Sequence, residues 1–194
     1  MRCKRGVAGN AEHRGRRSGR RWRLAAWSTA AALVLLPLAS MQFTNAVAWE
    51  LADFVIAAAL VLGVGITYEL AARKTRNGSY RTAVGIALAA AFILVWANLA
   101  VGVIGTEDER ANLMYVGVLA IGIVGAVIAR FQPRGLARAM VATALAQVLV
   151  GVVAWRAGWD DVGPITVFFA VLWFTSAWLF RKAAREHGSA DAVH

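Results

Sequence analysis

The chain has 194 residues, of which 59% are hydrophobic and 16% are charged, whereas a soluble domain is nearer half apolar and a quarter charged. Its net charge of +10 could suit nucleic acid, but 9 of its 21 Lys and Arg residues precede residue 24 and the rest flank apolar runs. Membrane orientation and attraction to anionic lipid explain this pattern more simply. The composition therefore argues against an ordinary soluble domain and against nucleic-acid binding.

The basic start of the chain leads into an apolar run. Residues 1–23 are rich in Arg and Gly, which predicts a disordered basic cytoplasmic arm. A first membrane span is expected at about 24–43. A charged start before an apolar run is also typical of a cleaved signal peptide, which would leave five spans. We favour a retained helix, because the run is long and Leu38-Ala39-Ser40 is a poor cleavage site.

Five further apolar runs follow. They predict spans at about 47–71, 82–104, 112–129, 136–155 and 164–180, and a cytoplasmic tail at 182–194. Asn77-Gly78 marks a turn between two of these spans, and Gln132-Pro133-Arg134-Gly135 marks a helix break. The expected fold is all-α: a polytopic bundle of six transmembrane helices over residues 24–181.

Lys and Arg fall in alternate gaps between the predicted spans. Nine precede residue 24, four follow the second span, three follow the fourth and three follow the sixth, while the other gaps hold only Arg110 and Arg156. Because positively charged loops stay in the cytoplasm, this alternation predicts that both termini are cytoplasmic.

The second predicted span carries acidic residues with no basic residue among them. Asp53 and Glu69 have 15 residues between them, about 22 Å of helix, and the hydrocarbon core is about 30 Å thick. Glu69 can pair with Arg73 at the cytoplasmic interface, which leaves Asp53 inside the membrane. An intramembrane acid is by default a candidate functional residue. Glu50 shares its helix face, and Asn98 lies at a similar depth in the third span.

Seven of the eleven acidic residues belong to the predicted outer half of the protein. We therefore predict a polar or ion site there, formed by Glu50, Asp53, Asn98, Asn112 and Tyr115. Two explanations stay open. Either Asp53 and Asn98 lock two helices together, or the group forms an outward-facing pathway for protons or cations.

Small residues recur at four-residue steps on two predicted spans. Such stripes let helices approach closely, and Thr or Gln can form hydrogen bonds across the contact. We expect these residues to pack against another span or another copy of the chain: Gly122, Gly125, Ala126, Ala129, Ala139, Thr143, Gln147 and Gly151.

Cysteine and histidine give no sign of a cofactor. Cys3 is the only cysteine, and the three histidines, His13, His187 and His194, all lie in the tails. We therefore expect no internal disulfide, no metal site and no haem.

Four segments stand out in the chain: Met41-Gln-Phe-Thr44, Asn98-Leu-Ala-Val-Gly102, Ala111-Asn-Leu-Met-Tyr115 and Ala129-Arg-Phe-Gln-Pro133. They resemble an uncharacterised family of small multi-pass bacterial inner-membrane proteins. The resemblance covers about residues 30–186. It implies a bacterial inner membrane and no particular activity.

The sequence favours a non-catalytic component that interacts or assembles with others in the membrane. The expected partners are the bilayer, including anionic lipids bound by the basic arm, and a second copy or another membrane protein. The alternative is a small transporter or a proton- or cation-conducting protein that uses the outward-facing acidic site. An enzyme is the least favoured class.

Overall fold

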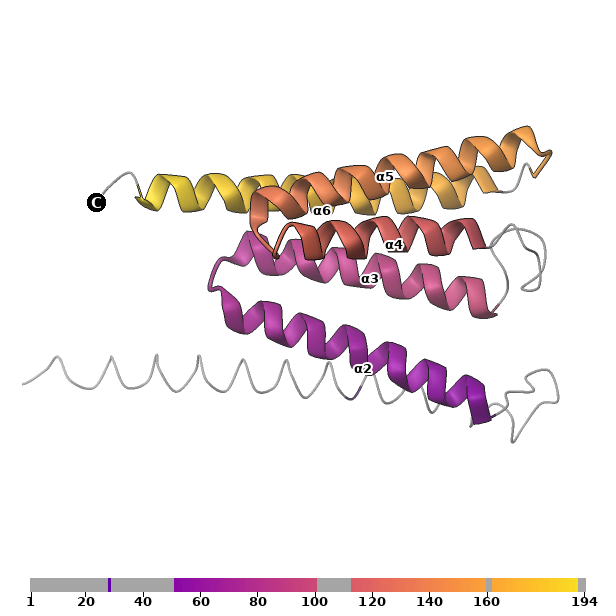
Figure 1. The fold of residues 1–194 in the computed structure, drawn as a ribbon, viewed down its shortest axis with the longest axis horizontal. Helices are drawn as coiled ribbons and strands as arrows, with labels where there is room; N and C mark the ends of the chain where they lie inside the picture. The colour runs from indigo at the N-terminus through magenta and orange to yellow at the C-terminus, as the bar shows by residue number, and fades with distance from the viewer. Residues whose placement is uncertain (1–27, 29–50, 101–112, 160–161, 192–194) are drawn as a thin grey trace, which may run out of the picture. The chain divides into compact units, whose positions relative to one another are not determined.

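The computed structural model describes Ser28 and residues 51–100, 113–159 and 162–191. These ranges form five helices: α2 (Leu51–Lys74), α3 (Gly78–Ala100), α4 (Leu113–Ile128), α5 (Pro133–Arg156) and α6 (Val162–Asp191) (Figure 1). The all-α prediction is confirmed for this part of the chain. The predicted basic arm and, apart from Ser28, the first predicted span lie outside the described residues.

Four of the described helices are long and apolar enough to cross a membrane. Their apolar stretches are Phe54–Lys74, Gly78–Asn98, Pro133–Arg156 and Val162–Gly188. The fourth predicted span is a shorter apolar helix, Leu113–Ile128. The prediction of a multi-pass membrane protein is therefore confirmed at this level.

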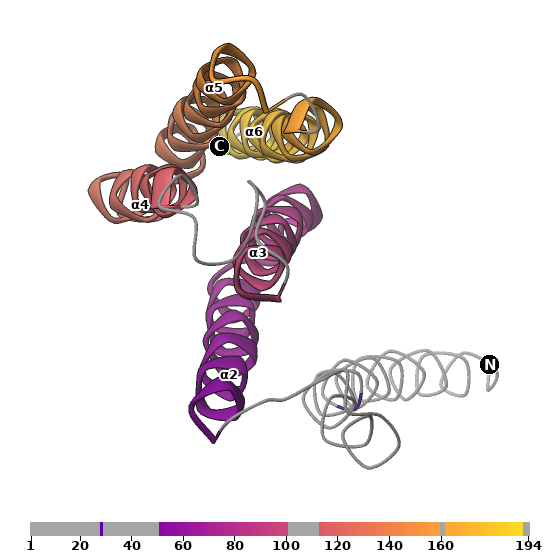
Figure 2. The same ribbon diagram turned by 90° about the vertical axis from the view of Figure 1, so that its right-hand side faces the viewer.

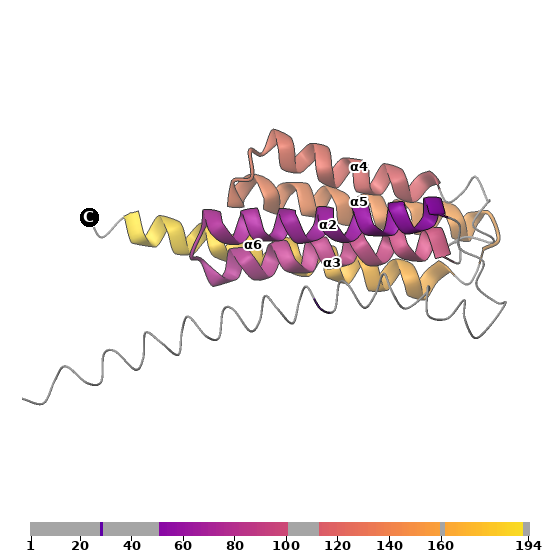
Figure 3. The same cartoon turned by 90° about the horizontal axis from the view of Figure 1, so that it is seen from below.

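The chain divides into two compact units between Gly65 and Ile66. The second unit contains the end of α2 and helices α3 to α6. Within it, α5 packs against both α4 and α6, and α6 also packs against α3. Figure 2 shows these four helices end-on, and Figure 3 shows them running alongside one another. Every major contact between the described helices of the unit thus involves α5, α6 or both.

The connection between α2 and α3 is short and capped. Arg73 and Lys74 occupy the last turn of α2, where positive charge is favourable. The Asn77 Oδ1 accepts a 2.8 Å hydrogen bond from the Tyr80 backbone N–H, so Asn77 caps the start of α3. The turn predicted at Asn77-Gly78 is thus a helix cap, and Gly78 is already helical.

The helix break predicted at 132–135 is present, but its strained positions are not glycines. Arg130 and Phe131 have φ angles of 48° and 58°, a left-handed conformation that few non-glycine residues adopt. The Phe131 N–H donates to the Ala126 carbonyl at 3.2 Å, which closes the end of α4. Pro133 then opens α5, where its missing N–H costs nothing.

Helix α5 ends in a Schellman motif. Gly158 has φ of 86°, which only glycine adopts readily. The Trp159 N–H donates to the Ala154 carbonyl at 3.1 Å, and the Gly158 N–H donates to the Trp155 carbonyl at 3.0 Å. This pair of bonds stops the helix and turns the chain toward α6.

Helix α6 is longer than its predicted span. It has 30 residues and continues through the segment expected to be a polar tail. Its buried residues recur at alternating steps of four and three, as in a coiled-coil seam. The seam consists of Val162, Thr166, Phe169, Trp173, Ser176, Phe180 and Ala183.

Candidate functional site

The structure describes only part of the polar site that the sequence predicts. Glu50 and Asn112 lie outside the described residues, and only the backbone of Asp53 is described, in the first turn of α2. Asn98 is half-buried near the end of α3, and Tyr115 is fully buried in the first turn of α4. The meeting of these five side chains, and the pairing of Asp53 with Asn98, stay predictions.

The small residues of α4 and α5 lie where the two helices approach closely. A Cβ atom on Gly122 would lie 3.1 Å from the Thr143 Oγ1, and one on Gly125 would lie 2.7 Å from the Ala139 Cβ. Real Cβ atoms rarely tolerate either distance. Ala126, from the same stripe, is half-buried and packs against the core.

Two further close approaches lie at the ends of this contact. A Cβ atom on Gly151 would lie 2.6 Å from the Thr166 Oγ1, which places α5 directly against α6. A Cβ atom on Gly135 would lie 2.6 Å from the Ala129 Cβ, which closes the turn between α4 and α5. The stripe on α5 therefore contacts a different neighbour at each end.

Among the described residues of the second unit, seven polar side chains are buried, and three of them have partners: Thr143, Ser176 and Tyr80, whose hydroxyl donates to the Phe131 carbonyl. The Thr143 hydroxyl donates to the Ala139 carbonyl of its own helix at 2.9 Å. The Ser176 hydroxyl donates to the Ala83 carbonyl at 2.9 Å, which joins α6 to α3. The buried polar atoms of the other four have no hydrogen-bond partner in the structure: Tyr115, Gln147, Thr166 and Trp173. A buried polar group without a partner costs about 1–3 kcal/mol, so these four need an explanation.

Sequence reasoning selected Tyr115 and Gln147 from this set but missed Thr166 and Trp173. The missed residues belong to the seam of α6, whose alternating spacing is visible in the sequence alone. A search for that period would have placed both residues on the buried face of α6. Their lack of a partner could not have been found that way.

A second polar cluster joins two connections and the end of α6 at one end of the second unit. The Asn77 Nδ2 donates to the Glu186 Oε2 at 2.8 Å, and the Ser79 hydroxyl donates to the Glu186 Oε1 at 3.1 Å. These bonds tie the α2–α3 connection to α6. The Tyr80 hydroxyl donates to the Phe131 carbonyl at 2.9 Å, which ties the start of α3 to the α4–α5 turn.

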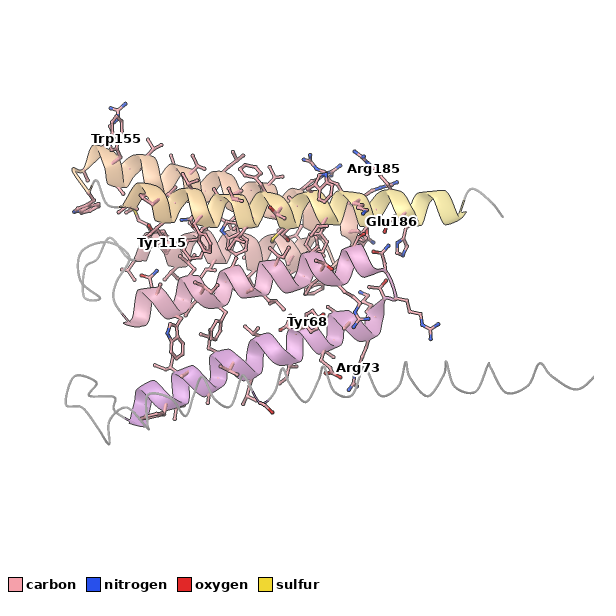
Figure 4. The ribbon with its side chains drawn as sticks, turned by 180° about the vertical axis from the view of Figure 1, so that it is seen from behind. Tyr68, Arg73, Tyr115, Trp155, Arg185 and Glu186 are labelled. Carbon is pink, nitrogen blue, oxygen red and sulfur yellow. The ribbon has the colours of Figure 1, made fainter. Side chains whose placement is uncertain are left out.

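These two connections, the helix ends beside them and the end of α6 carry most of the basic residues of the described helices. Figure 4 shows Arg73, Arg185 and Glu186 toward one end of the second unit and Trp155 at the other. We call this end the basic end. Its basic residues are Arg73, Lys74, Arg76, Arg81, Arg130, Arg134, Arg138, Arg181, Lys182 and Arg185.

Arg73 and Lys182 have partners that hold them near the helices. Arg73 forms a 3.0 Å ion pair with Glu69, one turn earlier on α2, as the sequence predicts. The Lys182 Nζ lies 5.9 Å from the centre of the Trp178 ring, a cation–π distance. Such exposed contacts contribute little to stability and mainly position the charges.

In the described part of the chain, no group of three or more His, Cys, Asp and Glu residues could hold a metal ion. Comparison with protein-family models, with curated proteins and with solved structures gives no match to this chain.

Proposed function

We propose that the protein is a six-span membrane protein with both termini in the cytoplasm, and that it acts without catalysis by binding other membrane components at its basic end. The resemblance noted in the sequence supports a bacterial inner membrane. The observation that carries the proposal is the junction of the α2–α3 connection, the α4–α5 turn and the end of α6 through Glu186 and Tyr80.

Helix α6 extends this junction beyond the membrane. Its 30 residues span about 45 Å, whereas the hydrocarbon core is about 30 Å thick. Ala183 and Ala184 stay buried in the extension, and Glu186 is bound by Asn77 and Ser79. The result is an ordered, positively charged surface, which suits anionic lipid headgroups and the lipid-facing edge of a partner protein.

Lipid retention by the purified protein tests this role. We would purify the full chain in nanodiscs that mix phosphatidylglycerol with phosphatidylcholine, and measure the retained lipids by native mass spectrometry. Each basic residue near a charged surface contributes about 1 kcal/mol, or about fivefold in affinity. We therefore expect Arg81→Gln with Arg134→Gln to reduce the retained phosphatidylglycerol severalfold, since both side chains are exposed at the basic end.

Arg156→Gln is the matched control, because Arg156 is exposed at the opposite end of α5. Its retained lipid should equal that of the wild type. Equal retention in all three proteins, or no preference for phosphatidylglycerol in the wild type, would contradict the proposal.

The competing function is a small transporter or a proton- or cation-conducting protein built on Glu50, Asp53 and Asn98. It is favoured by the position of Asp53 in α2, immediately before the apolar stretch Phe54–Lys74. In reconstituted vesicles, this function requires a proton or cation flux that Asp53→Asn abolishes and Glu69→Gln preserves. Absence of flux in the wild type, or equal flux in Asp53→Asn, excludes it.

A further inference from the structure

The four unpartnered polar side chains come from three different helices. They are Tyr115 on α4, Gln147 on α5, and Thr166 and Trp173 on α6, and each is at least nine-tenths buried. Their unpartnered atoms are the Tyr115 Oη, both Gln147 amide atoms, the Thr166 Oγ1 and the Trp173 Nε1. Buried polar groups in folded proteins are almost always satisfied by the protein or by ordered water.

The contacts between α4 and α5 place Tyr115 close to the level of Gln147. Gly122 lies against Thr143 and Gly125 against Ala139, so the two helices are antiparallel. Tyr115 precedes Gly122 by seven residues, and Val150 follows Thr143 by seven residues. Tyr115 is therefore level with Val150, about 4.5 Å along the axis from Gln147.

The contact between α5 and α6 places the other two residues around the same level. Gly151 of α5 lies against Thr166 of α6. Gln147, which precedes Gly151 by four residues, is therefore level with Ala170, which follows Thr166 by four residues. Thr166 and Trp173 then lie about 6 Å and 4.5 Å along the axis on either side of that level.

Gln147 also occupies the right face of α5 to meet both neighbours. It lies one turn from Thr143, which contacts α4, and one turn from Gly151, which contacts α6. A residue between these two contacts faces the junction of α4, α5 and α6. All four polar residues therefore lie along one stretch of the bundle, about 10.5 Å long, in the half away from the basic end.

We propose that this region binds water inside the bundle, held by Tyr115, Gln147, Thr166 and Trp173. The four side chains are all neutral, and together they offer both donors and acceptors. They suit a small uncharged molecule that donates and accepts hydrogen bonds, and a buried water typically has two to four such partners. This water site is separate from the basic end and does not depend on the role proposed for it.

Radiolytic footprinting tests the water site on the full chain in lipid nanodiscs. Irradiation converts bound water to hydroxyl radicals in place, and mass spectrometry then locates the modified side chains. Tyr115 and Trp173 should be modified severalfold more than Phe180, an aromatic residue that is equally buried but has no polar neighbour of this set. Modification of Tyr115 and Trp173 at the level of Phe180 would overturn the proposal.

A variant identifies the side chain that holds the water. Gln147→Leu keeps a similar volume and removes both amide atoms, so modification of Tyr115 and Trp173 should fall toward the level of Phe180. Ser176→Ala is the control, because Ser176 already has a partner on α3 and should leave both modifications unchanged. Unchanged modification in Gln147→Leu would also overturn the site. If that variant fails to fold, the comparison of Tyr115 and Trp173 with Phe180 in the wild type still tests the water site.

Discussion

Asn77 shows how one residue serves both its own helix and a distant one. Its Oδ1 caps α3 through the Tyr80 N–H, and its Nδ2 donates to Glu186 near the end of α6. The first contact is local and follows from the sequence. The second joins residues 109 positions apart and depends on the fold.

Substitutions at Asn77 separate these two contributions. Asn77→Ser keeps a capping oxygen but loses the donor to Glu186, whereas Asn77→Ala loses both. Loss of a helix cap costs about 1 kcal/mol, and the exposed bond to Glu186 contributes less. We expect Asn77→Ala to lower the free energy of unfolding by about 1–2 kcal/mol and Asn77→Ser by less than half of that. Unfolding by dodecyl sulfate in mixed micelles, followed by circular dichroism, measures both, and an unchanged midpoint in Asn77→Ala would refute the assignment.

At the scale of elements, helix α5 organises the second unit because glycines let its neighbours approach. Gly151 faces Thr166 of α6, and Gly122 and Gly125 of α4 face Thr143 and Ala139. By contrast, Gly117 on α4 is exposed and has open space where a Cβ would stand. The same residue type therefore has opposite roles on two faces of the bundle.

Alanine at these glycines should accordingly change stability in opposite directions. Gly151→Ala forces a Cβ into Thr166, and overpacking of this kind costs about 1–3 kcal/mol. Gly117→Ala meets nothing within 4 Å and should stabilise its helix by about 0.5–1 kcal/mol. The same unfolding assay compares both variants with the wild type. Destabilisation by Gly117→Ala equal to that by Gly151→Ala would show that the contact is not the cause.

A second substitution tests whether contact with Thr166 causes the loss of stability in Gly151→Ala. Thr166→Ala removes both the methyl group and the Oγ1 that a Cβ on Gly151 would meet. In the double variant, we expect part of the stability lost in Gly151→Ala to return, a coupling of about 0.5–3 kcal/mol. Simple addition of the two single effects would place the strain elsewhere.

At the scale of the whole molecule, the charges and the helix contacts agree. Two connections and the end of α6, which are far apart in the sequence, meet at the basic end through bonds of Glu186 and Tyr80. Arg156 lies at the other end of α5. Such a sorting of basic residues to one end agrees with the charge bias of loops in multi-pass membrane proteins.

Cysteine labelling tests the orientation directly. Cys3 is the only cysteine, so Cys3→Ser gives a background without thiols. In intact spheroplasts, an impermeant maleimide should label Ala157→Cys and should label Arg76→Cys only after the membrane is permeabilised. Both positions are exposed in the structure. The reverse pattern would invert the topology.

The sequence predicts the helices well because the signals for a membrane span lie within each segment. Apolar length, flanking Lys and Arg, the break at Pro133 and the Glu69–Arg73 pair are all local, and the described helices α2, α3, α5 and α6 follow them. The sequence does not predict that α6 continues to Asp191, because the contacts of Glu186 there come from residues of another connection.

The candidate sites, unlike the helices, depend on contacts between segments that are far apart in the sequence. Composition and spacing by themselves determine that the protein crosses the membrane several times and that its basic residues alternate between the gaps, because hydropathy and charge act on each segment separately. Only the tertiary structure decides that Ser176 has a partner while Gln147 and Trp173 have none. Such pairing depends on the register and rotation of one helix against another, and these arise from packing contacts such as Gly151 with Thr166.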